Sequence, residues 1–217
     1  MTLALFDLDN TLLNGDSDYL WGEFLVEREI VDAVEYKRCN QQFYDQYKRG
    51  TLDINEFLRF SLKPLSLYSM DQLLQWHQAF MKEKIIPLMT EKSKSLVESH
   101  RAQQHTLMII TATNRFITEP IAKSFGIPNL LASEPELINN RYTGKPTGVP
   151  CFQQGKITRL MQWLEHHDET LEGSWFYSDS YNDLPMLEIV SHPVVVNPDE
   201  RLAQHAKQMN WDLVSLL

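Results

Sequence analysis

The sequence predicts a doubly wound α/β fold, in which helices cover both faces of a mainly parallel β-sheet. Short apolar runs that each stop in a polar segment are typical of buried parallel strands. Helical apolar patterns lie between these runs, as the crossover connections of such a sheet require. The length of 217 residues suits one core domain with a small insertion rather than two equal domains.

Five apolar runs are predicted as strands. The first covers residues 3–6 and ends at Asp7, and the second covers 106–110 and ends at Thr111. Residues 174–177 and 193–196 form two more, and 129–132 a weaker one. Polar residues that follow such strands line the ligand crevice of a doubly wound sheet.

Helices are predicted between the strands. Residues 157–164 carry apolar side chains at i, i+3, i+4 and i+7, and residues 117–125 repeat the pattern before Gly126, which is suited to end a helix. Residues 182–185 open a further helix with a proline in its first turn.

Residues 15–88 break the alternation of strands and helices. They are rich in aromatic residues and helix formers, and residues 20–25 carry one apolar helical stripe. Asp53 and Asp71 are predicted to cap two further helices. We therefore expect a small all-helical cap over 15–88, inserted after the first strand of a core made of 1–14 and 89–217.

Composition excludes several classes of function. A net charge of −9 argues against a nucleic-acid partner and an anionic membrane surface, although a metal ion can still bring a small anion into a site. Two cysteines, Cys39 and Cys151, cannot build a disulfide framework or a zinc cluster. With no basic leader and no apolar stretch near ~20 residues, we expect a cytoplasmic protein.

Two acidic clusters follow predicted strands. Asp7 and Asp9 stand two residues apart with Thr11 beyond them, and close carboxylates of this kind favour a hard metal ion between them. One of the pair could attack an electrophile, although strand-terminating loop residues are the equal alternative. Asp179 and Asp183 form the second cluster, for which turn formation and helix capping are the alternative.

Two further residues are candidates for binding an anion. Thr111 ends the second predicted strand, where its hydroxyl and the backbone N–H groups that follow can hold a phosphate oxygen. Lys156 follows Gly155 at the start of a predicted helix and could neutralise an anion. Taken alone, a strand-end threonine and a solvent-facing lysine are the commoner interpretations.

These motifs together resemble the haloacid dehalogenase superfamily, on its phosphatase side. Residues 7–13 resemble the first family motif, Thr111 the second, Lys156 the third and residues 179–183 the fourth. The helical insertion resembles the small cap (type C1) of the phosphoserine-phosphatase-like branch, subfamily IB. Within that branch, the sequence is most similar to histidinol-phosphatase-like members. Phosphoserine phosphatases usually carry Ser-Gly-Gly at the second motif and a glutamate where Asp16 stands, so the resemblance to that activity is weaker.

The resemblance implies a role for each motif residue. Asp7 would attack phosphorus to give an aspartyl-phosphate, and Asp9 would act as general acid and base. Mg²⁺ would be held by the Asp7 carboxylate, the Asp9 carbonyl and Asp179. The phosphate would be bound by Thr111, Ala112, Lys156 and Asn182, with Thr11 and Asp183 supporting these groups from behind.

Substrate choice is expected to lie in the cap. Asp16 and Asp18 stand at its entrance, where carboxylates suit an ammonium or imidazolium group. The alternative is that they cap the next helix; Asp18 is the better cap candidate and Asp16 the better ligand candidate. The sequence thus predicts an Mg²⁺-dependent phosphomonoesterase, monomeric or homodimeric, for a small metabolite such as L-histidinol phosphate. A phosphoserine phosphatase, a broad-specificity phosphatase, a phosphotransferase and a non-catalytic regulator that binds a phosphorylated metabolite are the alternatives.

Overall fold

The computed structural model describes residues 2–216, and its centre is a seven-stranded sheet with the order β4-β3-β2-β1-β5-β6-β7. All neighbouring strands pair in parallel except β3 and β4, which pair antiparallel. β1 therefore lies in the middle, between β2 and β5. The strands are β1 Leu3–Phe6, β2 Thr106–Asn114, β3 Asn129–Ile138, β4 Arg141–Thr147, β5 Trp175–Ser178, β6 His192–Val196 and β7 Asp212–Val214.

Helices cover both faces of the sheet, as the sequence predicts. Alternate residues of β1 enter two separate cores: Ala4 and Phe6 pack with α5 (Glu91–Ala102) and α6 (Arg115–Ser124). Leu3 and Leu5 pack with helices on the other face, because successive side chains of a strand point to opposite sides. Those helices are α7 Gln154–Leu164, α8 Leu184–Leu187 and α9 Glu200–Met209.

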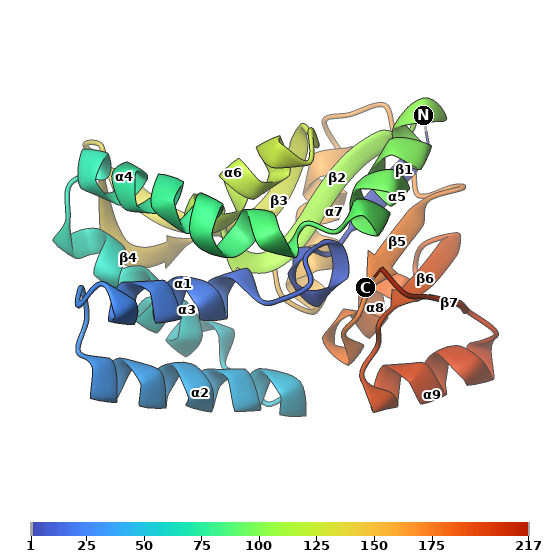
Figure 1. Ribbon diagram of the computed structural model, residues 1–217. Helices are drawn as coiled ribbons and strands as arrows, with labels where there is room; N and C mark the ends of the chain where they lie inside the picture. Colours follow the sequence, from blue (N-terminus) through green and yellow to red (C-terminus); the bar gives the residue numbers. More distant parts are fainter. Residues whose placement is uncertain (1, 217) are drawn as a thin grey trace.

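The inserted segment forms helices grouped on the left of Figure 1, away from β5–β7 and α9. They are α1 Ser17–Glu27, α2 Ala33–Arg49, α3 Ile54–Leu62 and α4 Met70–Phe80. The chain leaves and rejoins the core side by side, since Leu13 and Met89 form an antiparallel bridge and the Asn14 N–H donates to the Leu88 carbonyl (3.0 Å). The division into a core of 1–14 and 89–217 and a cap of 15–88 stays a prediction.

The cap and the core share an aromatic contact. The Trp21 ring of α1 lies 5.1 Å from the Phe80 ring and 5.5 Å from the Phe116 ring of α6 between centroids, both edge to face. The buried apolar residues of the cap helices join those of one sheet face in a single cluster. Within residues 2–216, no helix is both long and apolar enough to cross a membrane.

Several local predictions need correction. β2 continues through Thr111 to Asn114, and β3 continues to Ile138, where β4 pairs with it. β4 and β7 are missing from the prediction, because both lie at sheet edges and neither has an apolar run. Asp53 caps α3 as expected, but the cap of α4 is Ser69 rather than Asp71.

Candidate active site

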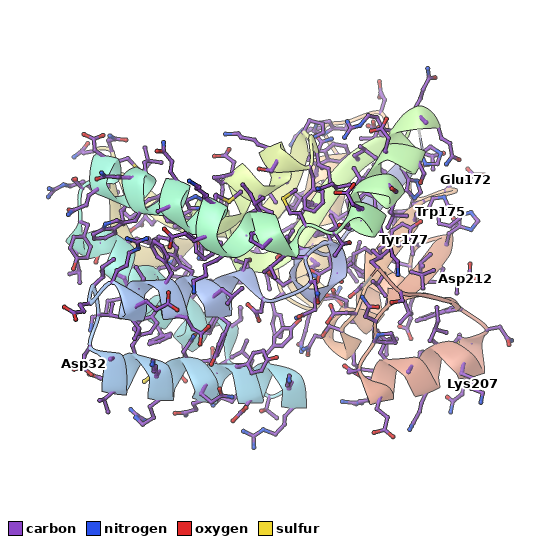
Figure 2. The ribbon with its side chains drawn as sticks, viewed as in Figure 1. Asp32, Glu172, Trp175, Tyr177, Lys207 and Asp212 are labelled. Atoms are coloured by element: carbon purple, nitrogen blue, oxygen red, sulfur yellow. The ribbon has the colours of Figure 1, made fainter. Side chains whose placement is uncertain are left out.

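The candidate site lies at the carboxyl ends of β1, β2 and β5. Phe6 of β1 is level with Ile109 of β2 and with Tyr177 of β5, which Figure 2 labels on that strand. The residue after Phe6 is Asp7, and its N–H donates to the Tyr177 carbonyl (2.9 Å). The register therefore brings the polar residues after these three strands to one edge of the sheet.

A tight turn over Leu8–Leu12 follows β1 and sets the spacing of the first acidic motif. Asn10 adopts a left-handed conformation (φ 57°), which asparagine tolerates better than most residues, and its N–H donates to the Gly15 carbonyl (2.9 Å). Thr11 then reaches the second acidic motif: its hydroxyl donates to Asp179 Oδ1 and accepts from the Asp179 N–H, both at 3.1 Å. Thr11 thus fixes the Asp179 carboxylate beside Asp7.

Lys156 is buried between two carboxylates. Its Nζ donates to Asp7 Oδ1 and to Asp183 Oδ2, each at 2.7 Å, and Ser178 Oγ also donates to Asp183 Oδ2 at 2.7 Å. The backbone at Gly155 passes so close to its neighbours that a Cβ there would overlap the Pro150 carbonyl oxygen. Glycine at this position therefore lets α7 start where Lys156 reaches the site.

Burial dominates the electrostatics of these groups. It raises the pKa of Asp7 to about 7, although the Lys156 ammonium opposes the rise. It also raises the pKa of Asp179 well above its usual range, with the charges of Asp7 and Asp183 adding to the effect. Burial acts to lower the pKa of Lys156, but Asp183 and Asp7 outweigh it and raise that pKa, so Lys156 is charged.

The donor set at this edge fits a hard divalent cation. Asp7 and Asp183 share the ammonium of Lys156, and Asp179 adds a third buried carboxylate on which the charges of both act. Such an excess of buried negative charge is relieved by a cation. Among residues 2–216, no three His, Cys, Asp or Glu side chains group so that they could hold a metal by themselves. Mg²⁺ suits this arrangement, because it takes one or two carboxylates and completes its octahedron with water and substrate phosphate.

The Asp9 carboxylate is held by two hydrogen bonds from other segments. Its Oδ1 accepts from the Ser17 N–H (2.6 Å) at the start of the cap, and its Oδ2 accepts from Thr113 Oγ1 (2.8 Å). Burial, followed by the charge of Asp16, raises the pKa of Asp9 to about 6. A carboxyl with such a pKa can give and take a proton near neutral pH.

Thr113 is a site residue that the sequence reasoning missed. It lies two residues beyond Thr111 on β2, and its N–H donates to Thr111 Oγ1 (3.2 Å). The signal was its spacing, because residues i and i+2 of a strand share one face. Thr111, Ala112 and Thr113 all line a cavity that Asp7 also lines. Thr111 and Ala112 are therefore placed where they could contact a phosphate at Asp7, and their phosphate-binding role stays a prediction.

A small cavity of about 60 Å³ lies between this edge and the cap. Its core wall contains Asp7 and Asp9, and its cap wall combines carboxylates with aromatic rings. Ligand pockets generally measure several hundred Å³, so this cavity is small for one. The cap residues that line the cavity include Asp16, Asp18, Tyr19, Asn40, Phe43, Tyr44, Tyr47 and Phe57.

The prediction that Asp18 is a better helix cap than Asp16 is wrong. Asp16 is the N-cap of α1, since its Oδ1 accepts from the Tyr19 N–H (2.9 Å). Asp18 lies in the first turn and does not cap. Both line the cavity, so a role in substrate choice remains a prediction for each.

Asn182 lies at the contact between core and cap. Its Nδ2 donates to the carbonyl of Tyr47 in α2 (3.0 Å), and its Oδ1 accepts from Gln153 Nε2 (3.1 Å). Its amide is thus used to join the cap to the core, whereas the sequence predicts a contact with phosphate. The phosphate contact stays a prediction.

Comparisons with known proteins agree with this geometry. The family model of haloacid dehalogenase-like hydrolases matches residues 4–188. A histidinol-phosphatase of Neisseria meningitidis is 45% identical over 217 residues, covering 98% of both chains. A crystal structure of a protein with unknown function from Bordetella pertussis Tohama I is 40% identical and covers all of both chains with a TM-score of 0.93. A phospho-aspartyl intermediate analogue of phosphoserine phosphatase, 17% identical, matches 99% of this chain and 92% of its own with a TM-score of 0.69, which shows a shared fold.

Proposed function

The chain belongs to the haloacid dehalogenase-like hydrolases and is a phosphatase of that family, and from this premise we propose that it is an Mg²⁺-dependent phosphomonoesterase for L-histidinol phosphate or a closely similar amino-alcohol phosphate. The observation that carries the proposal is the cavity itself. It joins Asp7 and Asp9 on one wall to carboxylates and aromatic rings on the other.

Asp7 is the nucleophile in this proposal. Its carboxylate attacks phosphorus, the bond from phosphorus to the alcohol oxygen breaks, and an aspartyl-phosphate forms on Asp7. Lys156 contacts Asp7 Oδ1 at 2.7 Å, which holds the carboxylate in place and favours its charged form. The same ammonium offsets the negative charge that spreads over the phosphoryl oxygens during transfer.

Asp9 handles the protons. It protonates the alcohol oxygen as that oxygen leaves, and it then takes a proton from the water that hydrolyses the aspartyl-phosphate. Ser17 and Thr113 hold the two oxygens of Asp9, so its carboxyl has a fixed orientation before substrate binds. The Ser17 contact also means that the first turn of the cap positions the proton donor.

Mg²⁺ would be held by the Asp7 carboxylate, the Asp9 carbonyl and Asp179. When bound, such an ion draws charge from the phosphoryl oxygens and fixes their orientation. Thr11 orients Asp179 by donating to its Oδ1 and by accepting from its N–H. Asp183 orients Lys156 by accepting from its Nζ.

Replacing Thr113 by valine tests the role of Asp9. The change removes the 2.8 Å hydrogen bond to Asp9 Oδ2. We expect kcat/KM for an alkyl phosphate, which reports the steps up to release of the alcohol, to fall about 10- to 100-fold, as for a hydrogen bond to a charged group. The loss for p-nitrophenyl phosphate should be smaller, because nitrophenolate leaves without a proton. Thr113→Ser keeps the hydroxyl and should restore most of the rate. Equal losses with both esters would contradict the assignment.

The substrate part of the proposal is supported by the similarity to a protein named histidinol-phosphatase and by the composition of the cap wall. L-Histidinol phosphate carries an ammonium group and a flat imidazole ring. Asp16 and Asp18 offer carboxylates to the first, and Phe43 and Phe57 offer ring faces to the second.

The proposed function is tested by phosphate release from a panel of esters in the presence of Mg²⁺. The panel contains L-histidinol phosphate, L-phosphoserine, phosphoethanolamine, sugar phosphates and nucleotides, and EDTA is added in parallel. We expect the highest kcat/KM for L-histidinol phosphate and loss of activity with EDTA, restored by excess Mg²⁺. A preference for L-phosphoserine, or activity that resists EDTA, would overturn the substrate or the metal, respectively.

A transfer reaction through the same aspartyl-phosphate is the second candidate. It is distinguished by adding alcohol acceptors to the assay. A phosphotransferase would release alcohol from L-histidinol phosphate faster than phosphate, whereas the proposed hydrolase releases both at the same rate.

A further inference from the structure

We propose that Asp18, rather than Asp16, is the carboxylate that selects the substrate, by pairing with a cationic nitrogen on the alcohol part of the phosphate ester. The inference rests on the proposed function, since it assigns a residue of the same cavity. The inference goes beyond the proposed function by stating which of two neighbouring carboxylates pairs with the cationic nitrogen of the substrate.

The Asp16 carboxylate is already used by the fold. It caps α1 by accepting from the Tyr19 N–H (2.9 Å), a contact that satisfies one of the unpaired donors at the start of every helix. Rotating Asp16 toward a ligand would break this cap. Its orientation is therefore set before any substrate arrives.

The Asp18 carboxylate has the opposite character. Its residue is 8% exposed and lines the cavity, yet its Oδ1 is buried without a hydrogen-bond partner. Buried carboxylate oxygens are almost always paired, because an unpaired one costs a large desolvation penalty. An unpaired oxygen at a cavity wall is thus the position that a bound donor would complete.

The surroundings of Asp18 favour a cationic partner. Burial, followed by the charges of Asp16 and Asp9, raises the pKa of Asp18 well above the usual range. The nearby Asn40 amide donates to the Tyr19 carbonyl (3.2 Å) and so is engaged elsewhere. A cation entering the cavity would favour the ionised form of Asp18 and would pair with it.

Shape limits the kind of molecule that can bring this cation. The catalytic carboxylates Asp7 and Asp9 and the cap residue Asp18 line one cavity, with Phe43 and Phe57 on the cap side. The ligand must therefore carry its positive nitrogen on the alcohol, a few bonds from the phosphorus. Amino-alcohol phosphates have this arrangement, whereas sugar phosphates and simple alkyl phosphates lack the charge.

A matched pair of esters tests the proposal. Phosphoethanolamine and propyl phosphate have nearly the same size and differ in that one ends in ammonium and the other in methyl. For the wild-type protein we expect a higher kcat/KM with phosphoethanolamine. Asp18→Asn should lower that kcat/KM about 10- to 100-fold, mainly through KM, and leave propyl phosphate within about 2-fold, because only the charge-assisted bond is lost.

Two variants and a melting curve separate this role from a structural one. Asp16→Asn keeps a good N-cap and should lose less of the preference for phosphoethanolamine than Asp18→Asn does. Asp32→Asn is the surface control, because Asp32 caps α2 at the outer end of the cap in Figure 2. Asp18→Asn should melt no lower than the wild type, since it replaces a buried carboxyl whose Oδ1 has no partner by a neutral group of the same size.

The outcomes are distinct. If the wild-type protein hydrolyses no ester, the proposed function is overturned and this inference with it. If it hydrolyses both esters equally well, or if Asp18→Asn slows both alike, the phosphatase stands and the role of Asp18 is overturned. A larger loss of preference in Asp16→Asn than in Asp18→Asn would assign the charge reading to Asp16.

Discussion

Asp7→Asn is expected to reduce turnover of every ester by about 10⁴-fold or more, because an amide cannot attack phosphorus to form the covalent intermediate. Asparagine keeps the size of the side chain and an oxygen that can accept from Lys156. The loss should therefore appear in kcat for all substrates and should not depend on the leaving group.

Stability measurements make this test sharp. Burial raises the pKa of Asp7, so the fold gains little from its charge, and Asp7→Asn should keep a melting temperature close to that of the wild type. A mass spectrum taken after rapid acid quench should show a phosphorylated wild-type protein and an unmodified variant. A folded Asp7→Asn protein that still turns over at more than a few per cent of the wild-type rate would sink the nucleophile assignment.

Lys156→Met is expected to have the largest effect on stability, about 3–5 kcal/mol in the free energy of unfolding, as for removal of one partner from a buried ion pair. Methionine fills a similar volume but leaves Asp7 and Asp183 without their shared ammonium, which contacts each at 2.7 Å. Urea unfolding at pH 7 measures the loss. We expect kcat to fall as well, by about 10²- to 10³-fold, because a preorganised charge near the phosphoryl oxygens is removed.

A double variant shows where the loss of stability comes from. Adding Asp183→Asn to Lys156→Met removes one of the two stranded carboxylates, so we expect part of the lost stability to return while kcat stays low. Lys123→Met is the matched control, since Lys123 is 71% exposed and pairs loosely with Glu119 at 3.5 Å; its effect should stay within about 0.5 kcal/mol. If the double variant is less stable than Lys156→Met alone, buried charge is not the source of the loss.

Much of the fold can be predicted from the sequence because its signals are local. The buried central strands appear as apolar runs, and α7 appears as a helical stripe at Ile157, Leu160 and Leu164. Gly126 ends α6 in a left-handed conformation (φ 65°), as its position suggests. β4 and β7 carry no such signal, because an edge strand is defined by the neighbour that it pairs with and not by its own apolar pattern.

Some residues of the candidate site can likewise be predicted from the sequence, and others cannot. Asp7, Asp9 and Asp179 are found from the sequence because each follows a buried strand, and parallel strands present their carboxyl ends together. Thr113 was missed, because its contact with Asp9 joins segments 104 residues apart. The sequence analysis did not identify Ser69 and Asp16 as the helix caps of α4 and α1, because several acidic or hydroxyl side chains near a helix start compete for the same N–H groups.

The sequence by itself determined the parallel sheet, the presence of a helical insertion and the acidic residues at the strand ends, because all three follow from patterns within a few residues. Only the tertiary structure decided that Lys156 is shared by Asp7 and Asp183, that Asp16 is spent on a helix cap, and that Asp18 is left with an unpaired oxygen at the cavity wall. The reason is that each N–H or O–H group donates its proton mainly to one acceptor. Which of several equally suited acceptors receives it depends on how distant segments pack.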